Sequence, residues 1–204
     1  KGAFAKTHEA GKLSSFLKAK KFTPERWKED KQKLIDKYYE HGYRDAQILE
    51  DSVSNYDGKH VDIYLKVDEG KQYFLRNVTW VGNTVYSTDY LSALLGMKKG
   101  DVYNQKLLHK RLNEDEDAVG NLYYNNGYVF SNINPAEVNI DGDSIDLEMR
   151  VTEGPQAYLS HIRINGNTRL YENVVRRELR TKPGDLFSKD AVMRSVRELA
   201  SMGH

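Results

Sequence analysis

The chain repeats itself at a fixed spacing, and this periodicity constrains its fold more than any other feature. The segment VTWVGNT, residues 78–84, returns as IRINGNT, residues 162–168, so that Gly82 and Gly166 lie 84 residues apart. The same offset relates VDEG at 67–70 to VTEG at 151–154. A unit of roughly 80 residues can close a small core of its own, whereas solenoid units of roughly 20 to 45 residues cannot. The sequence therefore predicts a tandem array of small domains.

The first half of one complete repeat predicts a strand and a short helix. Residues 73–81 alternate apolar and polar side chains with the period of a half-buried strand. The pair Gly82-Asn83 ends that strand, because both residues suit a turn. Ser87 or Thr88 then offers a hydroxyl to cap a short helix that ends at Gly96.

The second half predicts a long helix and a closing hairpin. The helix begins after Asn104, which caps it, and runs to about Asn125; it carries apolar residues at helical spacing, with Asp115 as the polar exception. Glu114–Asp117 form an acidic run, which is usually a solvated helix face, and we expect the Asp115 side chain to bend out at its rim. After Gly127, a strand opens at Tyr128, and a second strand follows with Ile145, Leu147, Met149 and Val151 on one face. The predicted core comprises Val78, Trp80, Leu94, Leu108, Leu112, Leu122, Ile145, Leu147 and Met149.

This order, β-α-α-β-β, predicts an α+β fold in which a three-stranded mixed sheet packs on two helices. Upstream, residues 1–70 repeat the long helix and the hairpin but lack a first strand. Downstream, residues 155–204 repeat a strand at 158–164 and two helices but lack the closing hairpin. We therefore expect one complete module at 71–154 between two partial ones, within a fragment of a longer protein.

Four marks recur in the same order along the chain. They read WVGNT and INGNT, GDVY and GDLF, HGY and NGY, VDEG and VTEG. Together with the β-α-α-β-β order they resemble POTRA domains, the periplasmic modules of the outer-membrane protein assembly factor (BamA type) and its relatives. The resemblance covers residues 22–204, and residues 1–20 lack a clear match.

The resemblance implies a non-enzymatic scaffold. Its expected partners are unfolded outer-membrane protein precursors and accessory assembly subunits, and its expected location is the periplasmic portion of a bacterial outer-membrane protein that is anchored by a C-terminal barrel. Two other functions stay open: a POTRA array for secretion or translocation through the outer membrane, and an unrelated α+β enzyme. A POTRA module of a cell-division protein is disfavoured, because the repeat is present in several copies.

Composition is consistent with this interpretation and argues against nucleic-acid binding. The formal net charge is +1, from 31 basic and 30 acidic residues, so no large field attracts nucleic acid or an anionic membrane. Cysteine is absent, as suits a periplasmic protein but also many others. No apolar run approaches the roughly 18 residues of a membrane helix.

The sequence predicts no catalytic residue, cofactor or metal ion. None of the six histidines has H-x-x-x-H or H-E-x-x-H spacing, which would place two metal ligands on one helix face. The turns at Gly82-Asn83 and Gly166-Asn167 lack the lysine and the glycine pattern of a phosphate loop.

Function is instead expected at a sheet edge. The chain order makes the last strand of each module central and places the strand after the GY pair outside, where its free backbone groups can accept an extended segment by β-augmentation. Pro135 and nearby charges are features that would protect such an edge. The candidate binding residues are Tyr43, Arg44, Asp45, Ala46, Gln47 and Ile48 upstream, and Tyr128, Val129, Phe130, Ser131, Asn132 and Ile133 in the complete module.

Overall fold

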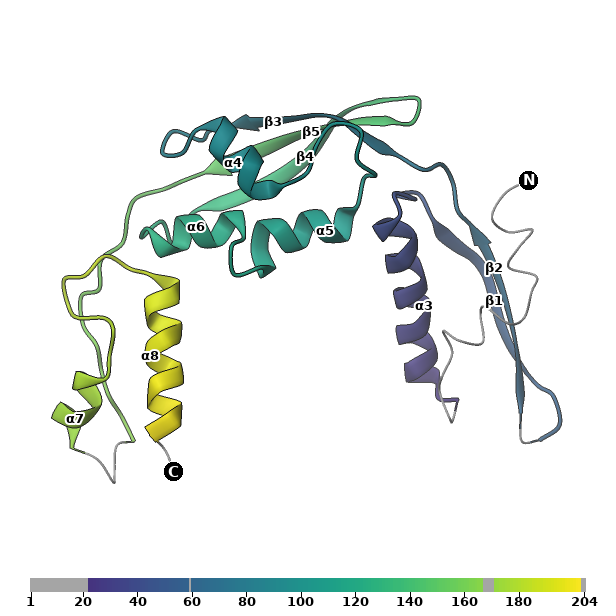
Figure 1. The fold of residues 1–204 in the computed structure, drawn as a ribbon. Helices are drawn as coiled ribbons and strands as arrows, with labels where there is room; N and C mark the ends of the chain where they lie inside the picture. Colours follow the sequence, from purple (N-terminus) through teal and green to yellow (C-terminus); the bar gives the residue numbers. More distant parts are fainter. Residues whose placement is uncertain (1–21, 59, 167–170, 203–204) are drawn as a thin grey trace. The chain divides into compact units, whose positions relative to one another are not determined.

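The structure is a computed structural model that describes residues 22–58, 60–166 and 171–202 (Figure 1). The described residues pack as two compact units, one within residues 22–74 and 102–106 and the other within residues 75–101 and 107–202. The prediction that residues 1–70 lack a first strand concerns residues 1–21, which lie outside the described residues. The predicted module boundaries at residues 70 and 154 stay a prediction.

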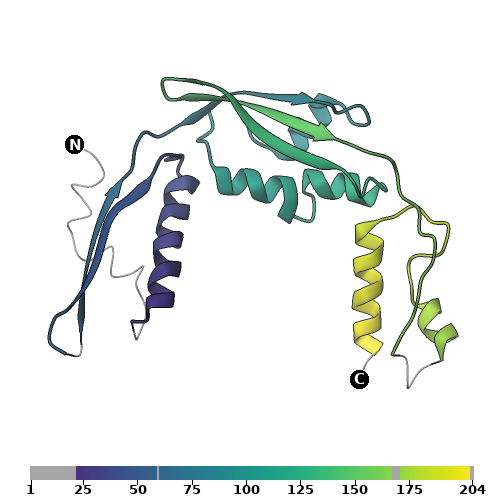
Figure 2. The ribbon, with the colours of Figure 1, turned by 180° about the vertical axis from the view of Figure 1, so that it is seen from behind.

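The first unit consists of one helix beside a hairpin. Helix α3 (Pro24–Glu40) begins after Thr23, whose hydroxyl accepts a hydrogen bond from the Arg26 amide at 3.3 Å, and Pro24 supplies the first helical residue. Strands β1 (Gln47–Asn55) and β2 (Val61–Asp68) pair antiparallel. Both views show the hairpin running alongside α3 (Figures 1 and 2).

Trp27 joins this helix to the hairpin. Its ring is 8% exposed, and its Nε1 donates to Asp51 Oδ2 of β1 at 3.1 Å. Lys31 Nζ lies 2.7 Å from the same carboxylate. The Asp51 carboxylate thus accepts from two side chains of α3 and orients the hairpin along it.

The second unit is built on a three-stranded mixed sheet of order β3-β5-β4. Strands β4 (Asn132–Asp141) and β5 (Ser144–Thr152) form an antiparallel hairpin. Strand β3 (Phe74–Val81) runs parallel to β5, because Arg76 contacts Asp146 near the start of both strands and Thr79 bonds the Leu147 carbonyl further along. The predicted α+β fold with a central last strand is confirmed.

One face of β5 forms the centre of the core. Ile145, Leu147, Met149 and Val151 are all buried, and helix α4 (Thr88–Leu95) contributes buried Leu91 and Leu95. Ser87 caps α4 and Gly96 ends it in the left-handed region, as predicted. Of the predicted core, Val78, Leu94 and Leu122 are only half-buried, whereas the remaining six residues are buried.

The predicted continuous helix from Asn104 to Asn125 is wrong. The segment divides into α5 (Gln105–His109), a π-helical turn η1 (Lys110–Glu114) and α6 (Val119–Asn125). At Asp115 the backbone becomes extended, with φ −61° and ψ 151°. The break resets the helical phase, so Tyr123 is fully buried and Leu122 is not.

Arg111 explains where the helix breaks. Its guanidinium lies 3.0 Å from Asp115 and 2.7 Å from Asp117, and it also donates to the Leu94 and Leu95 carbonyls at the end of α4. Those carbonyls lack helical partners, so a cation there satisfies them. The acidic run is therefore a loop folded around a half-buried arginine and not a solvated helix face. The Asp115 side chain is 19% exposed and is ion-paired.

Residues 155–202 contribute two helices, α7 (Glu172–Arg177) and α8 (Lys189–Met202). The strand predicted at 158–164 is wrong, since only an isolated bridge joins Tyr158 to Leu186. Within the described part of the chain no strand lies beside this segment to form a ladder. Asn167 and Thr168 of the second GNT mark lie outside the described residues.

The segments that follow the two VxEG marks make the same backbone hydrogen bonds. In the first unit, Tyr73 N donates to Gly42 O at 2.9 Å and Tyr103 N to Tyr73 O at 2.9 Å. In the second unit, Ala157 N donates to Gly127 O at 2.8 Å and Phe187 N to Ala157 O at 2.9 Å. The sequence repeat is thus also a repeat of backbone geometry at the ends of the modules.

Candidate functional site

Strand β4 is an outer strand of the three-stranded sheet. It pairs with β5, from Asn132 opposite Thr152 to Asp141 opposite Ser144, and no described strand lies on its other side. Unpaired amide and carbonyl groups along such an edge can bond an added strand. The position predicted for the edge, outside the central last strand, is confirmed.

Two features divide this edge into short stretches. Pro135 has no amide hydrogen, and the register shifts between Glu137 and Asn139, where Val138 forms a bulge. Proline and bulges are the devices by which proteins limit edge-to-edge association. Residues 132–134 and 139–141 remain as two stretches of regular strand.

The predicted start of the edge strand at Tyr128 is wrong, because residues 128–131 form a turn. Tyr128 N donates to Tyr123 O at 3.0 Å, and Ser131 N to Tyr128 O at 3.1 Å. These donors are used within the module and are not free for an added strand. Asn132 and Ile133 are the two predicted residues of this copy that belong to β4.

The upstream copy differs from the prediction in the same way. Tyr43 N donates to Tyr38 O at 3.0 Å, and Ala46 N to Tyr43 O at 3.1 Å, so the strand begins at Gln47. Arg44 and Asp45 lie in this turn. A helix followed at once by a strand needs a reversal of direction, and here the reversal occupies the four residues after each glycine.

These turns are fitted to the glycines that end each module. Gly154 has φ +68°, and a Cβ at that position would lie 3.2 Å from Phe130 Cβ. Gly70 has φ +67°, and its Cβ would lie 3.1 Å from Asp45 Cβ. Phe130 is nevertheless 67% exposed, so its ring is accessible beside the start of β4.

An ion-paired arginine covers the sheet face that points away from the core. Arg76 of β3 lies 2.7 Å from Asp146 of β5 and 2.9 Å from Asp141 at the tip of the hairpin. Its hydrogen bond, with that of Asn77, lowers the pKa of Asp146 to about 2. Three segments of the sheet are thus joined by charge on the solvent side.

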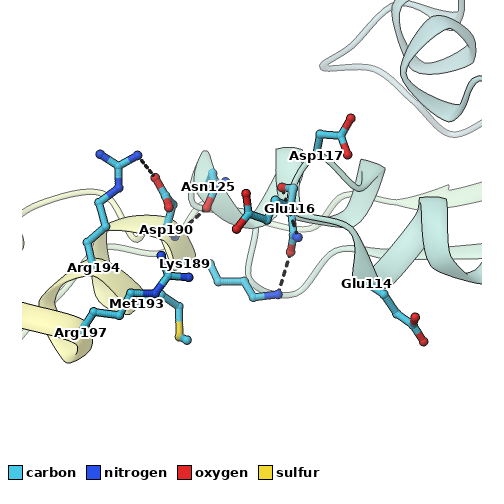
Figure 3. A pocket seen from close by; sticks show the side chains of 10 residues that line it. Glu114, Glu116, Asp117, Asn125, Lys189, Asp190, Met193, Arg194 and Arg197 are labelled. Carbon is cyan, nitrogen blue, oxygen red and sulfur yellow. Dashed lines mark hydrogen bonds and ion pairs between the residues drawn. The ribbon is translucent and has the colours of Figure 1, made fainter. Parts of the chain in front are cut away.

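A polar cavity of about 540 Å³ lies between the acidic loop and α8 (Figure 3). Glu116 and Asp117 line one side, and Arg194 and Arg197 line the other. Lys189 Nζ donates to Asn121 Oδ1 at 2.7 Å and links the two sides. The sequence analysis missed this cavity, because its walls come from residues about 70 positions apart and neither wall carries a motif.

The described residues offer no catalytic centre in this cavity. No cluster of three histidine, cysteine or acidic residues placed to hold a metal ion occurs among the described residues. The described residues that line the cavity carry carboxylates, guanidiniums, amides, an amine and a thioether, and none of them has a hydroxyl or thiol that could act as a nucleophile. In the described ranges, no helix is both long and apolar enough to cross a membrane.

The family model for POTRA, described as surface antigen variable number repeat, matches residues 2–70, 73–154 and 157–204. The chain belongs to the POTRA family. The three matches follow one another in tandem, and the repeat seen in the sequence is therefore a repeat of this domain.

Two curated bacterial proteins resemble the chain along most of its length. BamA, an outer membrane protein assembly factor of Neisseria meningitidis serogroup B, is 27% identical over 199 residues, which are 96% of this chain and 24% of that protein. A protein of Treponema pallidum is 29% identical over 193 residues, 92% of this chain and 23% of its own length. The chain thus spans about a quarter of these curated relatives.

A solved structure of POTRA domains shows the same fold. The crystal structure of POTRA domains 3–5 of Haemophilus influenzae BamA superposes with a TM-score of 0.72 at 25% identity. It covers 91% of this chain and 72% of that one. The POTRA fold predicted from the sequence is confirmed by this likeness.

Proposed function

We propose that this chain is the periplasmic POTRA array of an outer-membrane protein assembly factor, a scaffold without enzymatic activity. In this role it binds unfolded outer-membrane precursors and accessory assembly subunits. The tandem family matches support the proposal, together with relatives that are named for outer membrane protein assembly and that align with almost the whole chain.

Precursor binding is proposed to use the outer strand β4. A backbone edge suits a scaffold for many substrates, because main-chain hydrogen bonds do not depend on the identity of the side chains. The two regular stretches at 132–134 and 139–141 are the pairing segments, and the exposed ring of Phe130 lies next to the first. In the upstream copy, Gln47 and Ile48 open the corresponding strand β1.

The proposal is tested with peptides that pair through only one of their edges. An extended peptide presents alternate amides to its two sides, so N-methylation of the odd residues blocks one edge and N-methylation of the even residues blocks the other. We expect a peptide of about 10 residues from a barrel strand to shift the amide resonances of β4 in the intact chain. One methylated version should lose binding and the other should keep it.

The two methylated peptides have the same composition. If only one of them loses binding, the loss therefore cannot come from a difference in hydrophobicity. Each hydrogen bond contributes about 0.5 to 1.5 kcal/mol, which corresponds to severalfold to tenfold weaker binding per bond removed. Equal binding by both versions, or shifts that lie on α4 and α6 instead of β4, would contradict edge pairing. The scaffold role itself would fail if no barrel-derived peptide perturbed the chain.

A further inference from the structure

The helical segment between the GD and GY marks is longer in the second unit than its counterpart in the first. Thr23 and Asn104, the residues that precede the two segments, are 81 positions apart, whereas Tyr38 and Tyr123 near the helix ends are 85 apart. Helix α3 is continuous over 17 residues, and residues 105–125 number 21. The second unit therefore carries an insertion of four residues.

The insertion coincides with the acidic loop, residues 114–117, at which the helix of the second unit is interrupted. Joining residue 113 directly to residue 118 would leave 17 residues between positions 105 and 125, the length of α3. In the first unit, a helix of that length packs beside its hairpin without such a loop. The loop is therefore an addition to the module, and its contacts indicate what it adds.

Asn121 of α6 is hydrogen-bonded to the backbone of the acidic loop. This residue is 8% exposed, and its Nδ2 donates to Asp115 O at 2.7 Å and to Glu116 O at 3.5 Å. Carbonyl oxygens only accept, so the NH₂ end of the Asn121 amide must face them. The loop thereby orients this side chain and leaves Oδ1 as an acceptor for another group.

That acceptor is used by the first turn of α8. Lys189 Nζ donates to Asn121 Oδ1 at 2.7 Å, and the same ammonium group lies 5.9 Å from the centroid of the Tyr124 ring. The Asp190 amide donates to Asn125 Oδ1 at 2.8 Å (Figure 3). Asn121, Tyr124 and Asn125 are three and four positions apart and so share one face of α6. This face binds α8 by its side chains.

Among the described residues, the first unit has a different arrangement at the corresponding place. Asp36 stands where the second unit has Asn121, and it accepts from Gln32 of its own helix at 2.8 Å. Glu40, at the end of α3, pairs with Lys106 at 2.6 Å, and the Lys106 side chain is 63% exposed. Exposed ion pairs contribute little to stability. An asparagine oriented by a loop is thus a feature of the second unit.

We infer that the four inserted residues form a latch that fixes the orientation of the module that follows. The acidic loop orients Asn121, and Asn121 together with Tyr124 and Asn125 holds the first turn of α8 on α6. Arg111 anchors the loop to its own module, because it binds two carboxylates of the loop region and the end of α4. The partner of this surface is the next repeat of the same chain. The inference does not depend on the proposed function.

The test measures the distance between spin labels on the two modules. The chain has no cysteine, so labels attach only at the introduced Asp89→Cys on α4 and Ala200→Cys on α8, both of which are exposed positions. Pulsed electron paramagnetic resonance should give one narrow distance distribution for the otherwise unchanged chain. Lys189→Met removes the donor to Asn121 and should broaden the distribution. Lys182→Met, at an exposed lysine of the same module that does not line the cavity, is the matched control and should leave it narrow.

Deletion of residues 114–117 removes the latch and restores the helix length of the first unit. We expect the amide resonances of β5 to stay close to those of the unchanged chain, while the label distances spread as they do in Lys189→Met. Adding Lys189→Met to the deletion should cause no further spread, because both changes act on one contact. If the deletion prevents folding, Lys189→Met and its control decide the question.

Three results would overturn the inference. The first is a broad distribution in the chain with an intact latch. The second is a distribution that stays narrow in Lys189→Met or in the folded deletion variant. The third is equal broadening in Lys182→Met, which would mean that the loss of any lysine of this module has the same effect.

Discussion

Gly82 lies directly against the carbonyl of Val151, so that a Cβ at Gly82 would come within 2.2 Å of that oxygen. The backbone of Gly82 is also in the left-handed region, with φ +86°. Two separate constraints, the contact and the dihedral angle, therefore select glycine at the GN turn.

Replacing Gly82→Ala should destabilise the second unit by about 2 to 4 kcal/mol, because the left-handed conformation costs roughly 1 kcal/mol and the strand ends must also separate. Urea unfolding of the purified chain measures this. Gly142→Ala is the matched control, since Gly142 has φ +65° but nothing within 4 Å of the added Cβ. We expect this variant to lose only the stability that the left-handed conformation costs. Equal losses in the two variants would show that the contact with Val151 is unimportant.

Trp80→Ala should lower the free energy of unfolding by about 3 to 5 kcal/mol, the range for emptying a large buried aromatic site. Trp80 is 8% exposed, and its Nε1 donates to Ser92 Oγ of α4 at 3.0 Å. Chemical unfolding followed by circular dichroism tests this. The control is Tyr90→Ala, because Tyr90 of α4 is 49% exposed, and this change should alter stability little. A loss below 1 kcal/mol at Trp80 would mean that this ring does not anchor α4.

Arg111→Lys should destabilise the broken helix by about 1 to 2 kcal/mol, because lysine cannot bond two carboxylates and two carbonyls at once. Hydrogen exchange should accelerate at the Ala118 amide, which donates to Asp115 O at 3.0 Å. The neighbouring change Lys110→Ala removes only a 3.4 Å pair with Asp115 at the surface and serves as the control. If the two variants behave alike, the loop is held by its own backbone and not by Arg111.

The Arg76–Asp146 pair should make stability fall at low pH. The Asp146 pKa is lowered from 3.8 to about 2, so the folded state favours the ionised carboxylate. The stabilisation is present above pH 4 and is lost as the pH falls from about 4 to about 2. Unfolding midpoints measured across this range should fall less steeply in Asp146→Asn than in the unchanged chain. In Asp143→Asn, a change in the same hairpin, the unfolding midpoint should fall with pH as steeply as in the unchanged chain. If the midpoint fell equally steeply in Asp146→Asn, the Arg76–Asp146 pair would not be the cause of the pH dependence.

The parts of the fold that local sequence patterns encode were predictable. The alternation from Ile145 to Val151 identifies the buried face of β5, and Ser87 and Gly96 mark the ends of α4, because each signal depends on neighbouring residues only. The break at Asp115 was not predictable in this way. It depends on Arg111 reaching the carbonyls of α4, a contact that spans 16 or 17 residues and leaves no periodic trace.

The candidate site shows the same division. The outer position of β4 followed from the order of the elements, whereas its starting residue did not. Tyr128 and Phe130 alternate with Val129 and Ser131 as they would in a strand, yet the amides of Tyr128 and Ser131 bond backward into a turn. Side-chain alternation alone cannot distinguish a strand from such a turn, because the difference lies in the partners of the backbone.

The bonds that follow each VxEG mark connect main-chain atoms, and this has a consequence for how such arrays change over evolutionary time. Tyr73 and Ala157 occupy corresponding positions and differ in size and chemistry, yet both donate to the glycine of the preceding GY pair. Apart from Gln72 and Gln156, whose side-chain amides donate to the carbonyls of His41 and Asn126, the connection places few demands on side chains. A duplicated or deleted module that keeps this glutamine can then be rejoined to its neighbours without a larger set of matching mutations. Gene duplication within the array is then tolerated more readily than insertion within a module, and the copy number of the repeat can drift while its length of 84 residues is maintained.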